Sequence, residues 1–186
     1  HTLDKGFTGF KSTLDVFDEV GIQHPGGRTP HELKAGAIYE VNGVRIGHTA
    51  FTYGFNGIPV PGDAPWMAGL LYHEVGLEGV LERARSLRLR GAEFVVLSMQ
   101  WGNEYQQAPT DEQRQWARDL LSSPDVDLIL GDHVHVIQPC EQIEGKYVHY
   151  GMGNFLSNQT PAAGLLASTQ DGAVVRYEVQ EVARTL

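Results

Sequence analysis

The sequence predicts a single layered α/β domain. Two apolar runs, Phe94–Met99 and Val126–Leu130, have the length and composition of buried strands, and the first is unbroken, as expected for a strand buried on both faces. Amphipathic segments, with apolar residues at steps of three and four, lie before and between these runs. Helix and strand patterns that follow one another in this way are typical of a sheet covered by helices.

Local signals assign the elements of the first half in order. Residues 7–20 carry one apolar face and predict a helix that ends at Gly21. Asn42-Gly43 separates two apolar segments and predicts a hairpin with strands over 37–40 and 44–51. The residues that follow, 54–66, are rich in Gly and Pro and predict a long loop.

The second half is predicted to alternate helices with strands. Thr110 and Gln113 form a capping-box pattern at the start of a helix, and Glu144-Gly145 marks the turn of a hairpin. The predicted elements are helices over 77–87 and 110–122, and strands over 94–99, 126–130, 138–143, 146–150 and 172–182.

The composition is that of an ordinary globular protein of 186 residues, with a formal net charge of -9. This charge argues against a nucleic-acid binder, and no apolar run is long enough to span a membrane. Cys140 is the single cysteine, which excludes an internal disulfide, and we expect it to fill a small apolar space. We expect one domain over residues 1–186. The start at His1 reads like the middle of a loop, so we expect a chain truncated at its N-terminus.

Polar residues follow both predicted buried strands. Gln100 ends the first strand, and the second leads into Gly131-Asp132-His133-Val134-His135. Ligands gather beyond the carboxyl ends of parallel strands, so Gln100, His133 and His135 converge if these strands are adjacent and parallel. One amide oxygen and two imidazoles suit Zn, Mn or Fe. The two histidines alone are a weak signal, and a pair of solvated loop side chains is the competing interpretation.

Three nearby residues have two interpretations each. Glu104 either contacts substrate or a metal ligand, or is an ordinary surface residue. Asp132 either supports a ligand or serves the turn, and Asn154 either faces the site or is a turn residue. Trp101 is expected in the core. The histidines expected to be structural or exposed are His24, His31, His48, His73 and His149.

Four motifs resemble those of a known family. They are Gln100–Tyr105 (QWGNEY), Pro109–Gln113 (PTDEQ), Gly131–Pro139 (GDHVHVIQP) and Tyr150–Phe155 (YGMGNF), and His1–Gly6 matches the tail of an Asn-His segment. On these motifs the chain is similar to the CapA family of capsule synthesis proteins. That family is linked to poly-gamma-glutamate and is a branch of the calcineurin-like metallophosphoesterases.

The resemblance implies a four-layer α/β/β/α sandwich with two divalent transition metals, Zn, Mn or Fe, at its centre. It implies that Gln100 and His133 bind one metal, that His135 binds the other, and that His1 is catalytic. The family commonly has His at position 100, so Gln100 is expected to weaken binding or change the preferred metal. The family's upstream motifs supply further ligands and the first strands. Without them we expect this chain alone to hold metal poorly and to be inactive.

The resemblance leaves three functions as alternatives. The first is a metal-dependent hydrolase or transferase of capsule or poly-gamma-glutamate biosynthesis, and the second is a non-catalytic binding or assembly protein on the same fold. The third is a phosphoesterase of a small phosphate ester. The expected partners are a polyanionic polymer or phosphate-ester substrate and the membrane-associated capsule machinery outside the cytoplasm, but no nucleic acid. Exposed strand edges are expected to favour a dimer or a swapped oligomer.

Overall fold

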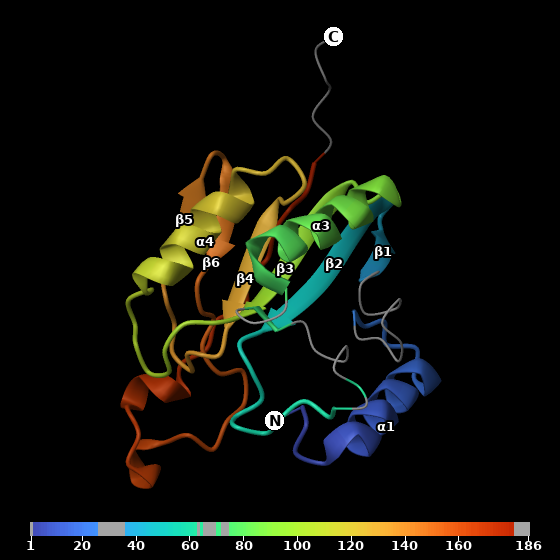
Figure 1. Cartoon of the computed structure of the whole chain (residues 1–186). Helices are drawn as coiled ribbons and strands as arrows, with labels where there is room; N and C mark the ends of the chain where they lie inside the picture. Colours follow the sequence, from blue (N-terminus) through green and yellow to red (C-terminus); the bar gives the residue numbers. More distant parts are fainter. Residues whose placement is uncertain (1, 26–35, 63, 65–69, 72–74, 181–186) are drawn as a thin grey trace.

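The computed structural model of the chain contains one mixed sheet and three α-helices in its described part, residues 2–25, 36–62, 64, 70–71 and 75–180 (Figure 1). The helices are α1 (Gly6–Glu19), α3 (Gly76–Leu89) and α4 (Asp111–Leu121). The strands are β1 (Ala37–Val41), β2 (Val44–Thr52), β3 (Phe94–Gln100), β4 (Leu128–Asp132), β5 (Cys140–Ile143) and β6 (Lys146–His149). Two 3-10 helices, η3 (Pro161–Ala163) and η4 (Ala167–Gln170), follow β6.

The sheet has the strand order β1-β2-β3-β4-β6-β5. Strands β2, β3, β4 and β6 run parallel, and β1 and β5 join them as antiparallel edge strands. The predicted hairpins are confirmed: Asn42 and Gly43 turn with φ of 52° and 82°, and Glu144 and Gly145 with 50° and 84°. Such left-handed pairs match the twist of the adjoining strands.

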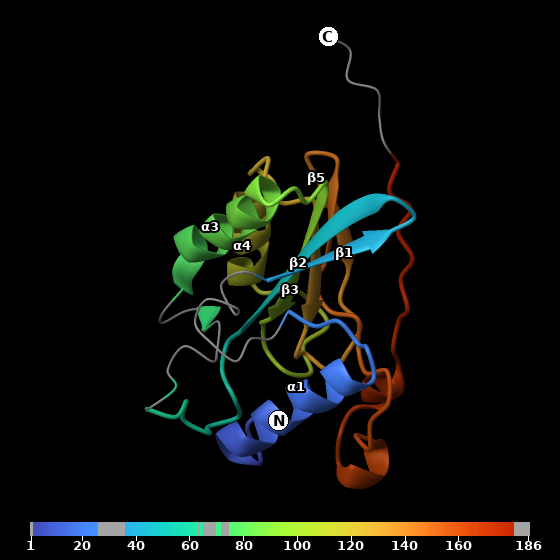
Figure 2. The same cartoon turned by 90° about the vertical axis from the view of Figure 1, so that its right-hand side faces the viewer.

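Helices α3 and α4 pack on the same face of the sheet (Figure 2). Each helix connects two parallel strands, as βαβ units require. Its buried side chains meet alternate residues of the strands, among them Val95, Leu97 and Met99 of β3. The Thr110–Gln113 capping box at the start of α4 is confirmed.

The opposite face of the sheet is less well covered, and this corrects the expectation of a strand buried on both faces. Side chains of β3 that face away from the helices, such as Val96 and Ser98, are only half-buried. The expected late strand over 172–182 is also wrong for its described residues, which make only an isolated bridge at Gly172. Instead, this segment runs past the sheet face (Figure 2), and Tyr177 packs on Tyr147 and His149.

Helix α1 lies beyond the end of the sheet to which the parallel strands point (Figures 1 and 2). It forms a second apolar cluster, in which Leu3, Phe10, Leu14 and Ala64 are buried. Cys140 is exposed on edge strand β5, so the expectation that it fills a core space is wrong. No helix in the described ranges is long and apolar enough to cross a membrane.

The predicted α/β class is confirmed, and the arrangement is consistent with a metallophosphoesterase-like fold. The described residues supply one sheet and the helix layer on one of its faces. These are two of the four layers that the family resemblance implies.

Candidate metal centre

The candidate site lies where the parallel strands end, at the edge of the sheet nearest α1 (Figure 1). The register places Thr52, Gln100 and Asp132 in one row across β2, β3 and β4. The convergence predicted from the two apolar runs therefore holds for the strands, which are adjacent and parallel. Ligand sites in α/β proteins typically occupy this edge.

Gln100 is positioned by the neighbouring strand. The hydroxyl of Thr52 donates a hydrogen bond to Oε1 of Gln100. Carbonyl oxygens have two lone pairs, so Oε1 retains one acceptor site for a metal or for another donor. Gln100 is half-buried, which leaves that site accessible.

His133 and His135 stand on a strained turn. Their φ angles are 88° and 59°, a region that costs a side-chain-bearing residue conformational energy. The backbone N–H of Tyr105 donates to the carbonyl oxygen of Val134 at 2.7 Å and ties this turn to the loop after β3. The imidazole centroids lie 6.3 Å apart. Strain of this kind is concentrated at functional sites because the surrounding structure must enforce it.

Asn154 fixes the orientation of His135. Its Nδ2 donates to the carbonyl oxygen of Thr169 at 2.9 Å and to Oε1 of Gln159 at 3.2 Å. Its Oδ1 therefore accepts, and Nδ1 of His135 donates to it at 2.8 Å. With the proton on Nδ1, Nε2 of the neutral ring carries the lone pair that a metal needs. Asn154 therefore contacts the histidine turn directly, and its role in a site stays a prediction.

Two tyrosines that the sequence analysis did not single out flank the histidines. The Tyr53 ring lies 4.1 Å from that of His133, and the Tyr105 ring stacks on His135 at 5.9 Å and 22°. Burial, followed by the charge of Glu104, raises the pKa of both tyrosines. Tyr53 directly follows β2, so the positional signal that selected Gln100 would also have found it.

The two carboxylates of the site differ in setting. Asp132 is exposed at the end of β4, but partial desolvation of its carboxyl raises the pKa to about 6, against an opposing effect of His135. Oε1 of Glu104 lies 4.0 Å from Nε2 of His135. Burial lowers the pKa of His133, which Glu104 partly offsets. Burial therefore favours the neutral form of the His133 imidazole, the form that binds metals.

Buried amides hold the loops beneath the site. Nε2 of Gln113 donates to Oε1 of Gln138 at 3.0 Å, and Nε2 of Gln138 donates to the carbonyl oxygen of Gln106 at 2.7 Å. Trp101 is buried, as expected, and its indole donates to the carbonyl oxygen of Tyr150 at 3.0 Å. These bonds join the loops after β3 and β4 to the end of β6.

The donors suit a metal but do not complete a site. Amide, carboxylate and imidazole groups are ligands for Zn, Mn and Fe. Within the described ranges, however, no group of three or more His, Cys, Asp or Glu side chains is arranged to hold an ion. The catalytic histidine expected at His1 lies outside the described residues.

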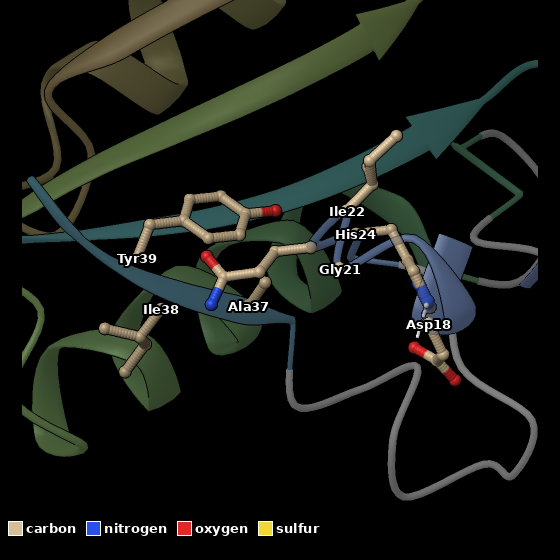
Figure 3. Close-up of a pocket in the computed structure, with 8 residues that line it drawn as sticks. Asp18, Gly21, Ile22, His24, Ala37, Ile38 and Tyr39 are labelled. Carbon is tan, nitrogen blue, oxygen red and sulfur yellow. Dashed lines mark hydrogen bonds and ion pairs between the residues drawn. The ribbon is translucent and has the colours of Figure 1, made fainter. Parts of the chain in front are cut away.

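The remaining histidines lie apart from this centre. A pocket of about 470 Å³ between the end of α1 and β1 contains His24, paired with Asp18 at 3.3 Å (Figure 3). His48 contacts Ser98 at 2.9 Å, and His149 contacts Tyr177. Neither the pocket nor these contacts include a candidate ligand. His31 and His73 lie outside the described residues.

Comparison with known proteins agrees with the motifs. A family model described as "Bacterial capsule synthesis protein PGA_cap" matches residues 1–159. The chain is 32% identical to the PGA biosynthesis protein CapA of Bacillus subtilis (strain 168), over 97% of this chain and 45% of that protein. It is 27% identical to the capsule biosynthesis protein CapA of Bacillus anthracis, over 97% of this chain and 43% of that protein. The chain thus spans less than half the length of these relatives, and it belongs to the PGA_cap family of bacterial capsule synthesis proteins.

Proposed function

We propose that the chain forms part of a two-metal centre of a hydrolase or transferase that acts in capsule or poly-gamma-glutamate biosynthesis. One observation carries the proposal: Asn154 holds His135 with its Nε2 lone pair directed to the site. A solvated loop histidine has no need of a partner that selects its tautomer. Family membership and the names of the two relatives support the biosynthetic role.

Each residue has a definite task in this proposal. Gln100 and His133 bind one ion, His135 binds the second, and the remaining ligands come from residues outside the described set. Bound metals would lower the pKa of a water molecule and neutralise charge on the reacting group. Tyr53 and Tyr105 restrict the imidazole rings by packing against them. Asp132 precedes His133 in the chain. In this proposal its carboxyl either carries a proton near the metals or accepts a hydrogen bond from a metal ligand.

The expected substrate is a polyanionic polymer or a phosphate ester, because metal charge offsets anionic charge in a protein with a net charge of -9. We place the activity at the cell envelope, outside the cytoplasm and with membrane-associated capsule machinery, since capsule material is assembled there.

Elemental analysis tests the proposal on a protein extended to the full length of the relatives. We expect about two equivalents of transition metal, and loss of at least one in His133→Ala and in His135→Ala. His149→Ala is the matched control, because His149 lies on β6 away from the candidate ligands. An extended, folded protein without stoichiometric metal would overturn the proposal.

A binding or assembly protein on the same fold is the second candidate. The incomplete ligand group among the described residues and Gln100 at a position where the family commonly has His favour it. In this case, His133→Ala and His135→Ala would leave capsule production in cells unchanged. Loss of capsule with either variant, but not with His149→Ala, would exclude it.

A further inference from the structure

We propose that Glu104 binds the same metal ion as His135, as a carboxylate ligand. This inference rests on the two-metal function proposed above and assigns a role to a residue outside the three expected ligands. Four features of the loop after β3 support it.

The first feature is a pair of facing metal-ligating atoms. Nδ1 of His135 donates to Asn154, which leaves Nε2 as the ring nitrogen that faces the site. A carboxylate oxygen of Glu104 lies opposite, at 4.0 Å. Imidazole nitrogen and carboxylate oxygen are both common metal ligands, so one cation between them could contact both.

The second feature is the separation itself. A hydrogen bond between nitrogen and oxygen spans about 2.7–3.2 Å, so 4.0 Å is too long for a proton to bridge the atoms. Zinc bonds measure about 2.0–2.1 Å to nitrogen and about 2.0–2.2 Å to oxygen, so two ligand atoms of one ion lie at most about 4.3 Å apart, and closer at a tetrahedral angle. One ion can therefore contact both atoms. Glu104 is exposed, so its side chain is free to close the angle at the metal.

The third feature is the rigid backbone that presents Glu104. Gly102 and Tyr105, on either side of it, have φ angles of 82° and 65°. A Cβ at Gly102 would lie 2.6 Å from Gln113, so the loop packs closely on α4. Tyr105 binds the carbonyl oxygen of Val134 and stacks on His135. The position of Glu104 is thus set by contacts to the histidine turn.

The fourth feature is the charge around Glu104. Within the part of the chain that the structure describes, its ion-pair partner is His135 rather than a lysine or arginine. Besides burial, the charge of Glu104 raises the pKa of Tyr53 and Tyr105, and it partly offsets the burial that lowers the pKa of His133, so the carboxylate lies close to these residues of the site.

Titration of the extended, metal-free protein with Zn²⁺ and Mn²⁺ by calorimetry tests the inference. We expect Glu104→Gln to weaken binding of one equivalent by at least about tenfold, the lower limit for the loss of even an outer partner of a ligand. The loss of affinity should be greater for Mn²⁺ than for Zn²⁺, because Mn²⁺ prefers carboxylate oxygen. Glu112→Gln is the matched control, because Glu112 is exposed on α4 and its substitution removes the same charge.

Absorption spectra of the Co²⁺-loaded protein separate a ligand from a nearby charge. If Glu104 is a ligand, Glu104→Gln changes the visible bands and Glu112→Gln does not. Unchanged affinity and spectra in Glu104→Gln, together with two bound metals, would overturn the role of Glu104 and leave the two-metal centre intact. No metal in the unsubstituted extended protein would instead overturn the centre itself.

Discussion

At the scale of single residues, the histidine turn depends on a partner that selects one tautomer of the His135 ring. Oδ1 of Asn154 can only accept from this ring, because the amide nitrogen of Asn154 donates to Thr169 and Gln159. The tautomer is therefore fixed before any metal binds. A site prepared in this way loses less freedom when its ligand arrives.

Replacing Asn154 with Leu should release this control. We expect Asn154→Leu to mix the two neutral tautomers of His135 in the metal-free protein, and to weaken metal binding by about 10–100-fold in the extended protein. Nitrogen NMR shifts of the imidazole report the tautomer without any metal. Gln170→Leu serves as the control, because Gln170 is exposed at the end of η4. A His135 ring unchanged in Asn154→Leu would contradict the assigned role.

His48 gives the stability of the protein a predictable pH dependence. Burial lowers its pKa from 6.5, and it contacts Ser98 and Tyr39. The unfolded chain therefore binds more protons than the folded one as the pH falls through about 6.5, so the free energy of unfolding decreases there.

The substitution His48→Gln keeps a polar side chain but removes this titration. We expect its free energy of unfolding to fall less steeply between about pH 7 and pH 5 than that of the unsubstituted protein. Denaturant unfolding at a series of pH values measures the slope. Some slope should remain, because burial also lowers the pKa of His133 and His149. An identical slope in both proteins would contradict the prediction.

At the scale of elements, β4 and the chain after β6 approach one another closely. A Cβ at Gly131 would lie 2.1 Å from the carbonyl oxygen of Tyr150 and 2.5 Å from the indole nitrogen of Trp101. The second of these atoms donates to the first. Any side chain at Gly131 would therefore break a buried hydrogen bond at the base of the histidine turn.

Substitution of Gly131 with Ala should destabilise the protein by about 1–3 kcal/mol, the usual cost of forcing extra atoms into a packed interior. Gly54→Ala is the control, because a Cβ there meets nothing within 4 Å. Thermal unfolding of the two variants measures the difference. Equal stability of Gly131→Ala and Gly54→Ala would contradict the prediction, because β4 and the segment after β6 would then separate without a loss in the free energy of unfolding.

Most elements were predictable because their signals are local. Turn residues such as Asn42-Gly43 and the Thr110–Gln113 capping box encode their conformation within a few positions, and both are confirmed. The segment around Tyr177 alternates like a strand but lacks a free strand edge beside it. Its Tyr177 ring instead packs on side chains of the sheet face. Whether an alternating segment pairs as a strand or packs on a face depends on residues far away in the sequence.

At the scale of the whole molecule, the strand order determines which loops meet. Gln100 and the histidine turn were predictable together, because a helix between two buried runs implies parallel neighbours. The position of Tyr53 at the end of β2 carries the same signal, but its contact with His133 and that of Asn154 with His135 were not predictable, since they depend on β2 and β6 lying on either side of that pair. A single sequence carries no direct signal of strand order.

The positive φ angles of the histidine turn have a consequence for how this chain changes over generations. Glycine adopts such angles at a lower cost than histidine, so a lineage that no longer needs the imidazoles would gain stability by losing them. His133→Gly should be more stable than His133→Ala by about 1 kcal/mol, whereas His48→Gly, in a regular strand, should be less stable than His48→Ala. Chemical denaturation of the four variants measures both differences. The two histidines therefore give up some stability of the fold in return for the positions of their side chains.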